Sequence, residues 1–189
     1  MSKFNKFDIL DTPISSLKII QRHPLNDQRG YLERFFCKDE LKAIVHEKNI
    51  QQINHTLTKT RGTVRGMHFQ IQPYSEIKLV SCLKGEVYDV AIDLRQDSPT
   101  FLSYYAEILS DNNYKTLYIP EGFAHGFQTL SDDCEMLYLH TNVYVASAER
   151  GLNALDLRVN IQWPLLITER SPRDISREML LCDFKGITI

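Results

Sequence analysis

The sequence predicts an all-β protein, a sandwich or barrel of antiparallel strands with few short helices. Short apolar or alternating runs recur at intervals of roughly ten residues and are separated by Gly, Pro, Asn and Asp. This spacing is typical of antiparallel architectures, because βαβ units need helical patterns between their strands. Lys84-Gly85, between two such runs, also has the form of a two-residue hairpin turn.

Each candidate strand is a short apolar or alternating run. In chain order the runs cover residues 17–21, 30–36, 51–58, 64–69, 77–83, 86–94, 104–108, 115–119, 123–130 and 134–141. No internal repeat, low-complexity tract or linker interrupts this series. We therefore expect one domain over residues 1–189.

Helical patterns are confined to two short segments. Residues 40–47 place Leu41 and Val45 on one inward face. Asp39 directly precedes this segment and is the candidate N-cap. The alternation loosens towards the C-terminus, where residues 174–181 are expected to form a second short helix.

The composition is ordinary for a soluble globular protein, with 43% hydrophobic and 24% charged residues. The net charge of −2 provides no basic footprint, which argues against a nucleic-acid partner. No run reaches the about 18 apolar residues of a membrane span, and the N-terminus is too polar for a secretory signal. The four cysteines show neither C-x-x-C nor zinc spacing. We expect a cytoplasmic protein with reduced thiols and no membrane association.

Two carboxylates fall on one face of the run 86–94. Alternation places Asp89 and Asp93 with Val87 and Ala91, on a face that is otherwise small and apolar. Buried carboxylates are costly without partners. These two are therefore either exposed to solvent or paired with cationic or histidine side chains from elsewhere in the chain.

Residues 61–70 and 119–127 contain the histidines that can serve as such partners, His68 and His125. The second segment carries the P-x-G-x-x-H pattern of a cupin. A metal-binding cupin has a second histidine two positions after the first, but Gln70 stands there, and the nearest glutamate is Glu76. Because a transition metal needs three or four ligands, we expect no metal.

A series of motifs resembles the dTDP-4-dehydrorhamnose 3,5-epimerase family, whose members are cupin-type barrels of the jelly-roll kind. The matching segments occur in the family's order, from 27 to 174. They are DQRG at 27–30, QIN at 52–54, RGMHFQ at 65–70, KLV at 78–80, DVAIDLR at 89–95, DSPTF at 97–101, IPEGFAHGF at 119–127, IQWP at 161–164 and SPRD at 171–174.

This resemblance implies catalytic roles for residues at matching positions. His68 corresponds to the catalytic base, and Asp174 to the carboxylate that orients it. Lys78 corresponds to the cation beside the keto oxygen of the substrate. Tyr138 corresponds to the acid on the opposite face of the sugar.

The resemblance further implies that His125 and Asp89 form a second histidine–carboxylate pair in the same pocket. Other matching positions contact the nucleotide and its diphosphate. These substrate-binding positions are Arg29, Glu33, Gln52, Asn54, Arg65, Glu149 and Arg173.

The implied activity is epimerisation at C3, C5 or both, next to the C4 ketone of a nucleotide-diphosphate 4-keto-6-deoxy sugar. Such a C–H is acidic because its carbanion delocalises as an enolate. A carboxylate-braced histidine is a suitable base, and an ammonium stabilises the oxyanion. No nicotinamide, flavin or other cofactor is needed, and no glycine-rich dinucleotide loop is present. The family is dimeric, and residues 17–20 are a candidate edge for pairing across a twofold axis.

Two other functions remain open from the sequence. A sugar-nucleotide 3,4-ketoisomerase would also use histidines without metal, but it would move the ketone to C3. A non-catalytic nucleotide-sugar-binding cupin is the third possibility, and the intact set of His68, Lys78, Tyr138 and Asp174 argues against it.

Several residues also have purely structural interpretations. Tyr138 is a candidate core residue, and Asp174 is a candidate N-cap of the last helix. Arg65 and His68 are three apart, so a regular strand directs them to opposite faces, and a bulge at Gly66 is needed for both to line one pocket.

The chain departs from the family pattern in the nucleotide- and sugar-contacting part of the site. Arg34 stands where a glutamate is usual, with Glu33 one position early. Leu139 replaces a lysine, and Arg173 replaces another lysine just before Asp174. These departures leave the nucleotide, the sugar and the number of inverted centres open.

Overall fold

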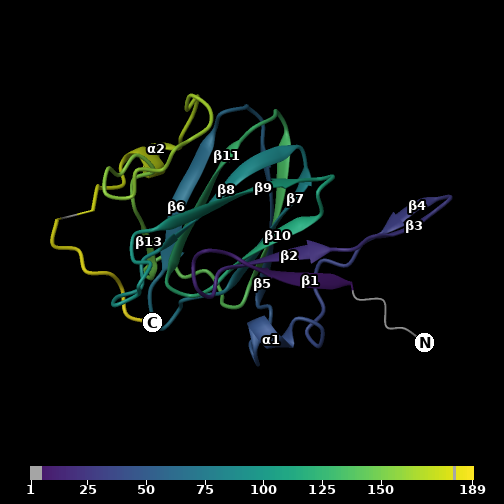
Figure 1. Ribbon diagram of the computed structural model, residues 1–189. Helices are drawn as coiled ribbons and strands as arrows, with labels where there is room; N and C mark the ends of the chain where they lie inside the picture. The colour runs from purple at the N-terminus through teal and green to yellow at the C-terminus, as the bar shows by residue number, and fades with distance from the viewer. Residues whose placement is uncertain (1–5, 181) are drawn as a thin grey trace.

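The computed structural model describes residues 6–180 and 182–189. Strands dominate it, and the helices within these residues are two single turns, α1 (Lys42–Val45) and α2 (Pro172–Ile175) (Figure 1). The strands are β1 (Phe7–Asp11), β2 (Lys18–Arg22), β3 (Leu25–Asp27), β4 (Gly30–Leu32), β5 (Gln52–Thr58), β6 (Val64–Gln70), β7 (Lys78–Lys84), β8 (Glu86–Asp93), β9 (Tyr104–Ser110), β10 (Lys115–Ile119), β11 (Phe123–Thr129), β12 (Cys134–His140) and β13 (Glu149–Gly151). The prediction of an all-β protein with few short helices is confirmed.

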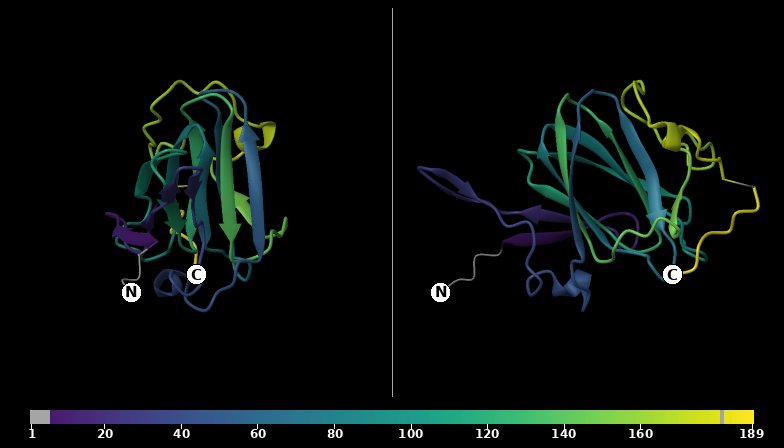
Figure 2. Two further views of the ribbon diagram at one scale, coloured as in Figure 1. Left: turned by 90° about the vertical axis from the view of Figure 1, so that its right-hand side faces the viewer. Right: turned by 180° about the vertical axis from the view of Figure 1, so that it is seen from behind.

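Two antiparallel sheets lie face to face (Figure 2). The larger has the order β1-β2-β10-β7-β12-β5, and the smaller has the order β13-β6-β11-β8-β9. A core cluster joins them, with Val80 and Met136 from the larger sheet packed against Ala91 and Phe127 from the smaller. Burial of each large apolar side chain contributes about 1.5–3 kcal/mol, so this cluster holds the sheets together.

The outer face of each sheet is covered in part. Leu41 and Val45 of the α1 segment pack on the larger sheet beside Leu79. C-terminal residues such as Leu152 pack on the smaller sheet beside Ile92. The hairpin β3–β4, by contrast, extends away from the body (Figures 1 and 2). None of the helices in the described ranges is long and apolar enough to cross a membrane.

Most predicted strands are confirmed to within one or two residues at each end, and residues 115–119 match β10 in full. The predicted strand 30–36 is wrong beyond Leu32. Glu33 instead turns inward and forms an ion pair of 2.6 Å with Arg22, and both side chains are buried. β1, β3 and β13 have no counterpart among the predicted strands.

Both predicted helices are shorter than expected. Leu41, not Asp39, is the N-cap of α1, without a side-chain hydrogen bond, and the helix ends where His46 adopts a positive φ of 54°. The C-terminal helix begins two residues before the predicted 174–181 and ends at Ile175, because Ser171 caps it and accepts a hydrogen bond from the Asp174 amide. Residue 181 lies outside the described residues.

The predicted edge formed by residues 17–20 is also wrong. β2 is paired on one side with β1 and on the other with β10. The backbone groups of β2 therefore already form hydrogen bonds with two strands of the same chain. The edges of the larger sheet are β1 and β5.

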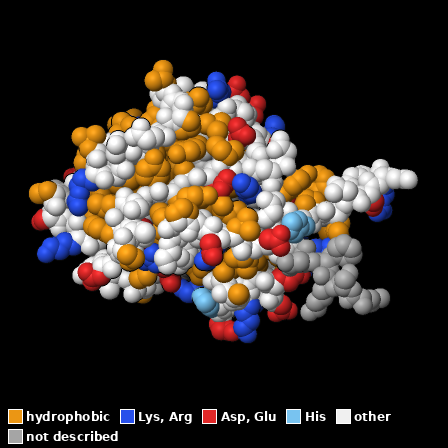
Figure 3. All heavy atoms as spheres, viewed as in Figure 1, with side chains coloured by type: hydrophobic (Ala, Val, Ile, Leu, Met, Phe, Trp, Pro, Cys, Tyr) orange, Lys and Arg blue, Asp and Glu red, His pale blue; other side chains and the backbone are white. Residues whose placement is uncertain are grey.

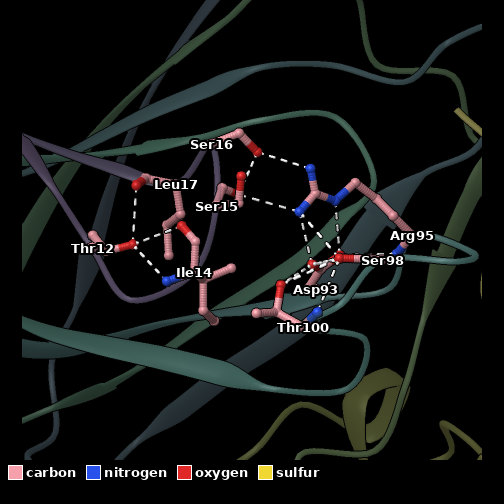
Figure 4. Close-up of polar contacts among 9 residues, drawn as sticks. All are labelled: Thr12, Ile14, Ser15, Ser16, Leu17, Asp93, Arg95, Ser98 and Thr100. Atoms are coloured by element: carbon pink, nitrogen blue, oxygen red, sulfur yellow. Dashed lines mark hydrogen bonds and ion pairs between the residues drawn. The ribbon is translucent and has the colours of Figure 1, made fainter.

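The alternation predicted for β8 is confirmed, and both of its carboxylates are fully buried. Asp93 lies in a polar cage at the end of the strand (Figure 4). Arg95 donates to both of its oxygens at 2.9 and 2.8 Å, and Ser98 and Thr100 add hydrogen bonds of 2.6 and 2.7 Å. Arg95 also donates to Ser16, so the cage connects β8 to the loop before β2.

We expect Asp93→Asn to lower the free energy of unfolding at neutral pH by about 3 kcal/mol, because the variant leaves Arg95 without its buried counter-ion. Burial by itself raises the pKa of Asp93, but the hydrogen bonds from Arg95, Ser98 and Thr100 outweigh it and hold the pKa below its ordinary value. The charged form therefore stabilises the fold above the unfolded pKa of about 3.9, and this contribution disappears as the pH falls through the folded pKa.

Urea unfolding of both proteins at neutral pH and at a pH below about 3 measures this effect. The difference between Asp93→Asn and the wild type should shrink in acid. Asp11→Asn is the control, since the Asp11 side chain is 86% exposed and pairs with Lys18 at the surface. It should change stability by less than about 1 kcal/mol. An equal deficit of Asp93→Asn at both pH values would contradict the electrostatic role.

Candidate functional site

A cavity of about 680 Å³ lies between the two sheets. His68 on β6 and His125 on β11 line it from the smaller sheet, and Lys78 on β7 and Tyr138 on β12 line it from the larger. Asp174 of α2 contributes a carboxylate. A second cavity of about 530 Å³ adjoins the first. The two share Asn54, His68, Lys78, His140 and Arg173 in their walls.

His68 is held by a carboxylate from the other end of the chain. Its Nε2 lies 2.6 Å from Asp174 Oδ1, and the second carboxylate oxygen accepts from the Gly66 amide at 3.3 Å. Burial raises the pKa of Asp174, but the hydrogen bond and charge of His68 outweigh it and lower the pKa. Asp174 therefore stays ionised and fixes the ring of His68. The alternative in which Asp174 is an N-cap is wrong, because Ser171 caps α2.

A bulge in β6 lets Arg65 and His68 line the same cavity. Opposite β11, His68 pairs with His125 whereas Arg65 pairs with Phe127, so β6 contains one extra residue at this point. Gly66 has a φ of +122°, and a Cβ there would lie 2.7 Å from the Cα of Gly126. The bulge expected at Gly66 is thus confirmed, and its position requires glycine.

His125 and Asp89 form a second pair, deeper in the core. His125 Nε2 lies 2.9 Å from Asp89 Oδ1, and both side chains are almost fully buried. The rings of His125 and Tyr138 pack edge to face at a centroid distance of 6.0 Å. Burial raises the pKa of Tyr138, and the charge of Asp89 raises it further. The phenol therefore keeps its proton at neutral pH and is available as a donor.

Lys78 lies between the two cavities. Its Nζ donates to the backbone oxygen of His68 at 3.3 Å and lies 3.5 Å from Glu76 Oε1. The side chain is only 11% exposed. An ammonium in so dry a position is well suited to stabilise a developing oxyanion.

Four of the predicted substrate-binding residues line the second cavity: Gln52, Asn54, Glu149 and Arg173. Glu149 forms an ion pair with Arg173. Its carboxylate also accepts from Arg177 at 3.3 Å and from the Tyr144 hydroxyl at 2.6 Å. Arg65, the fifth, lines the first cavity, where its Nε donates to Thr58 Oγ1 at 2.8 Å. The arginines of the site are thus held in place by neighbouring side chains.

Arg29 and Glu33 lie outside both cavities. Arg29 is at the tip of the β3–β4 hairpin, where it pairs with Asp27 and its side chain is 90% exposed. Glu33 is occupied by its buried ion pair with Arg22, above which Phe35 lies. Within one chain, therefore, neither residue reaches the site.

Two of the departures from the family pattern, Arg34 and Leu139, also lie outside the cavities. Arg34 forms an ion pair with Glu40. Leu139 is buried in the cluster beneath α1, on the face of β12 opposite Tyr138. Neither of these two changes the cavity wall, whereas Arg173, a third departure, lines both cavities.

Glu76 and His140 are among the residues that line the site and were not predicted from the sequence. His140 lies two residues after Tyr138 on the same strand, so alternation places both on one face. That spacing was the available signal. Glu76 lies in the irregular segment before β7, where no periodicity points to the site. In the part of the chain that the structure describes, no group of three His, Cys, Asp or Glu residues could hold a metal ion.

Comparison with known proteins gives a consistent result. A model of the dTDP-4-dehydrorhamnose 3,5-epimerase family matches residues 11–181. The chain is 40% identical over 170 residues to the dTDP-4-dehydrorhamnose 3,5-epimerase of Shigella flexneri, covering 89% of this chain and 93% of that protein.

Solved structures agree with this. The dTDP-6-deoxy-D-glucose-3,5-epimerase of Legionella pneumophila, in complex with dTDP-4-keto-L-rhamnose, superposes with a TM-score of 0.90 at 35% identity, covering 96% of this chain and 97% of that one. A 3′-monoepimerase from Streptomyces bikiniensis, in complex with dTDP-quinovose, has a TM-score of 0.82 at 26% identity, covering 90% and 86%. The expected cupin-like fold is therefore confirmed.

Proposed function

Because the chain belongs to the dTDP-4-dehydrorhamnose 3,5-epimerase family, we propose that it inverts both C3 and C5 of a dTDP-4-keto-6-deoxy sugar, through an enolate and without a cofactor. Inversion at two centres is supported by the identity of 40% to a 3,5-epimerase, against 26% to a 3′-monoepimerase. A single domain and a cytoplasmic location remain predictions from the sequence.

One observation carries the proposal: a candidate base and a candidate acid line the same cavity from opposite sheets. His68 belongs to β6 of the smaller sheet and Tyr138 to β12 of the larger. A sugar ring bound between them presents one face to each residue. Inversion requires removal of a proton from one face and delivery to the other, which this arrangement permits.

The residues divide the chemistry as follows. Asp174 accepts from Nε2 of His68, which leaves Nδ1 as the nitrogen that removes the proton next to the ketone. Lys78 stabilises the oxygen of the enolate. Tyr138 then protonates the opposite face, and the His125–Asp89 pair supports the pocket beside it. Arg65 and Arg173 hold the diphosphate, because guanidinium groups are permanently charged and planar.

Incubation of the wild-type protein with dTDP-4-keto-6-deoxyglucose in D2O tests the proposal. Proton NMR should show deuterium at C3 and at C5, and a product of inverted configuration at both carbons. Deuterium at only one carbon would show that the protein is a mono-epimerase and would contradict inversion at both centres. Movement of the ketone to C3, or no exchange at all, would overturn the proposal.

We also expect a homodimer. Leu25, Tyr31 and Leu32 on the projecting hairpin are 45%, 58% and 64% exposed. The space-filling view shows hydrophobic side chains at the base of this hairpin (Figure 3). Exposed apolar side chains on an extended arm are typical of a surface that another subunit covers. In a dimer, Arg29 at the tip of this hairpin would extend towards a cavity of the other subunit.

Light scattering at micromolar concentration should therefore report twice the chain mass of 22.0 kDa. Leu32→Glu should shift the protein to the monomer, because a charge in a buried apolar contact is costly. Leu166→Glu, at a side chain that is 91% exposed outside the arm, is the control and should remain dimeric. A monomeric wild-type mass would contradict the prediction.

A further inference from the structure

A directional chain of hydrogen bonds runs along the second cavity. The Tyr144 amide, which can only donate, lies 3.0 Å from Gln52 Oε1. This contact sets the orientation of the Gln52 side chain, whose Nε2 donates to Asn54 Oδ1 at 3.2 Å. The Asn54 amide nitrogen in turn lies 3.3 Å from Nε2 of His140, which must therefore be the acceptor.

His140 passes the chain on to a buried carboxylate. Its Nδ1 lies 2.8 Å from Glu76 Oε2, and because a carboxylate only accepts, Nδ1 carries the proton. With Nε2 accepting and Nδ1 donating, the ring is the neutral Nδ1–H tautomer. Both side chains are about nine-tenths buried, and the ring stacks on Tyr138 with an interplanar angle of 18°. The partners of His140 thus fix both its protonation and its position.

Glu76 divides its two oxygens between His140 and Lys78. Oε2 accepts from His140, and Oε1 lies 3.5 Å from Lys78 Nζ. Burial raises the pKa of Glu76, but the hydrogen bond from His140 and the charge of Lys78 outweigh it and lower the pKa, so the group stays ionised. Its negative charge, held in place by His140, attracts the Lys78 ammonium on one side.

The geometry assigns Glu76 and His140 as positioning residues that connect the substrate-binding amide of Asn54 to the ammonium of Lys78. The assignment deepens the proposed function and rests on it. Glu76 holds Lys78 where the enolate oxygen forms, and His140 holds both Glu76 and Asn54. Because His140 contacts Glu76 through Nδ1 and Asn54 through Nε2, it serves catalysis through Lys78 and binding through Asn54.

Different kinetic effects are expected for the two residues. Loss of one oxyanion donor costs about 10²–10³-fold in kcat, so Glu76→Gln, which misplaces Lys78 without removing it, should lower kcat by about 10- to 100-fold. KM should change by less than about threefold, because the amide oxygen of the substituted side chain can still accept from His140, and Asn54 keeps its partner. His140→Phe keeps a stacked ring but removes the hydrogen bonds to both Glu76 and Asn54, so it should lower kcat and raise KM.

A conservative variant separates this role from simple packing. His140→Gln offers an amide NH2 as donor and an oxygen as acceptor, so it can replace both the N–H donor and the nitrogen acceptor of the neutral imidazole. It should recover much of both parameters relative to His140→Phe. The double variant Glu76→Gln/His140→Phe should lose little more kcat than the worse single variant, because both changes act on the same contact.

The matched control is the pair His55–Glu135, which joins β5 and β12, the strands of Asn54 and His140, at 3.0 Å, with the His55 side chain 53% exposed. His55→Phe and Glu135→Gln should leave kcat and KM unchanged. Deuterium exchange by the wild type is measured first, since its absence would refute the proposed function and not the positioning role.

With an active wild type, an unchanged kcat in Glu76→Gln would overturn the assignment, and so would additive losses in the double variant. Circular dichroism verifies the folding of each variant. If Glu76→Gln does not fold, the comparison of His140→Gln with His140→Phe decides, and equal kinetics of these two would overturn the assignment.

Discussion

Replacement of His68 by alanine should lower the rate of C–H exchange by about 10²–10⁴-fold, the usual contribution of a positioned general base. Asp174 and Lys78 remain in this variant, but no side chain is left in the place of His68 to remove the proton from the sugar. The arginines and amides expected to hold the nucleotide diphosphate are unchanged. Affinity for dTDP should therefore stay within severalfold of the wild type. Deuterium incorporation followed by NMR, with calorimetric titration of dTDP, measures both quantities.

A third histidine–aspartate pair, on the surface, provides the matched control. His23 Nε2 lies 2.7 Å from Asp8 Oδ2 on the surface, where the His23 side chain is 44% exposed. His23→Ala removes the same kind of contact away from both cavities and should leave exchange unchanged. Substantial exchange in His68→Ala would show that another group is the base. A loss of dTDP affinity as large as the loss of exchange would assign His68 to binding instead.

Tyr138→Phe should separate exchange from inversion. The variant keeps His68, Lys78 and the shape of the pocket, and it loses one hydroxyl group. The enolate should therefore still form, and His68 can return a solvent-derived deuteron to the face from which the proton came. This requires that the base exchange its proton with solvent before it reprotonates the enolate. The expected product has gained deuterium with its configuration retained, and the yield of epimer should fall by about 10²-fold or more.

Tyr118→Phe is the control for loss of a buried tyrosine hydroxyl. Tyr118 donates to the Ile44 oxygen at 2.7 Å, in the cluster beneath α1. Its replacement should cost about 1 kcal/mol of stability and leave the ratio of inversion to exchange unchanged. Inversion by Tyr138→Phe at nearly the wild-type rate would show that another group or water is the acid. Loss of both exchange and dTDP-sugar binding would instead make Tyr138 a residue that positions the sugar.

Much of the fold was predictable because its signals are local. Alternation over 86–94 separated the two faces of β8, and the structure buries Val87 and Ala91 between the sheets and Ile92 beneath the C-terminal segment. Strands of this kind are encoded by a period of two residues. Helix ends were predicted less well, because α1 is a single turn whose limits depend on packing of Leu41 and on the backbone of His46.

Within the site, the residue types were likewise predictable from local sequence, whereas their contacts were not. The residue types for proton transfer were recognisable in sequence, since His68 and His125 lie in motifs with specific neighbours. Asp89 and Asp93 share one strand face, yet one carboxylate contacts His125 and the other fills the cage of Arg95. Spacing along one strand contains no information about which partner another strand provides.

By itself, the sequence determined the all-β class, the positions of most strands and the set of residues capable of the chemistry. Only the tertiary structure decided which of them meet. It joined His68 to Asp174 across more than a hundred residues, buried Glu33 against Arg22 away from the cavities, and placed Glu76 and His140 beside Lys78. The physical reason is that periodicity is set by neighbours along the chain, whereas hydrogen bonds, ion pairs and burial are set by contacts between distant segments.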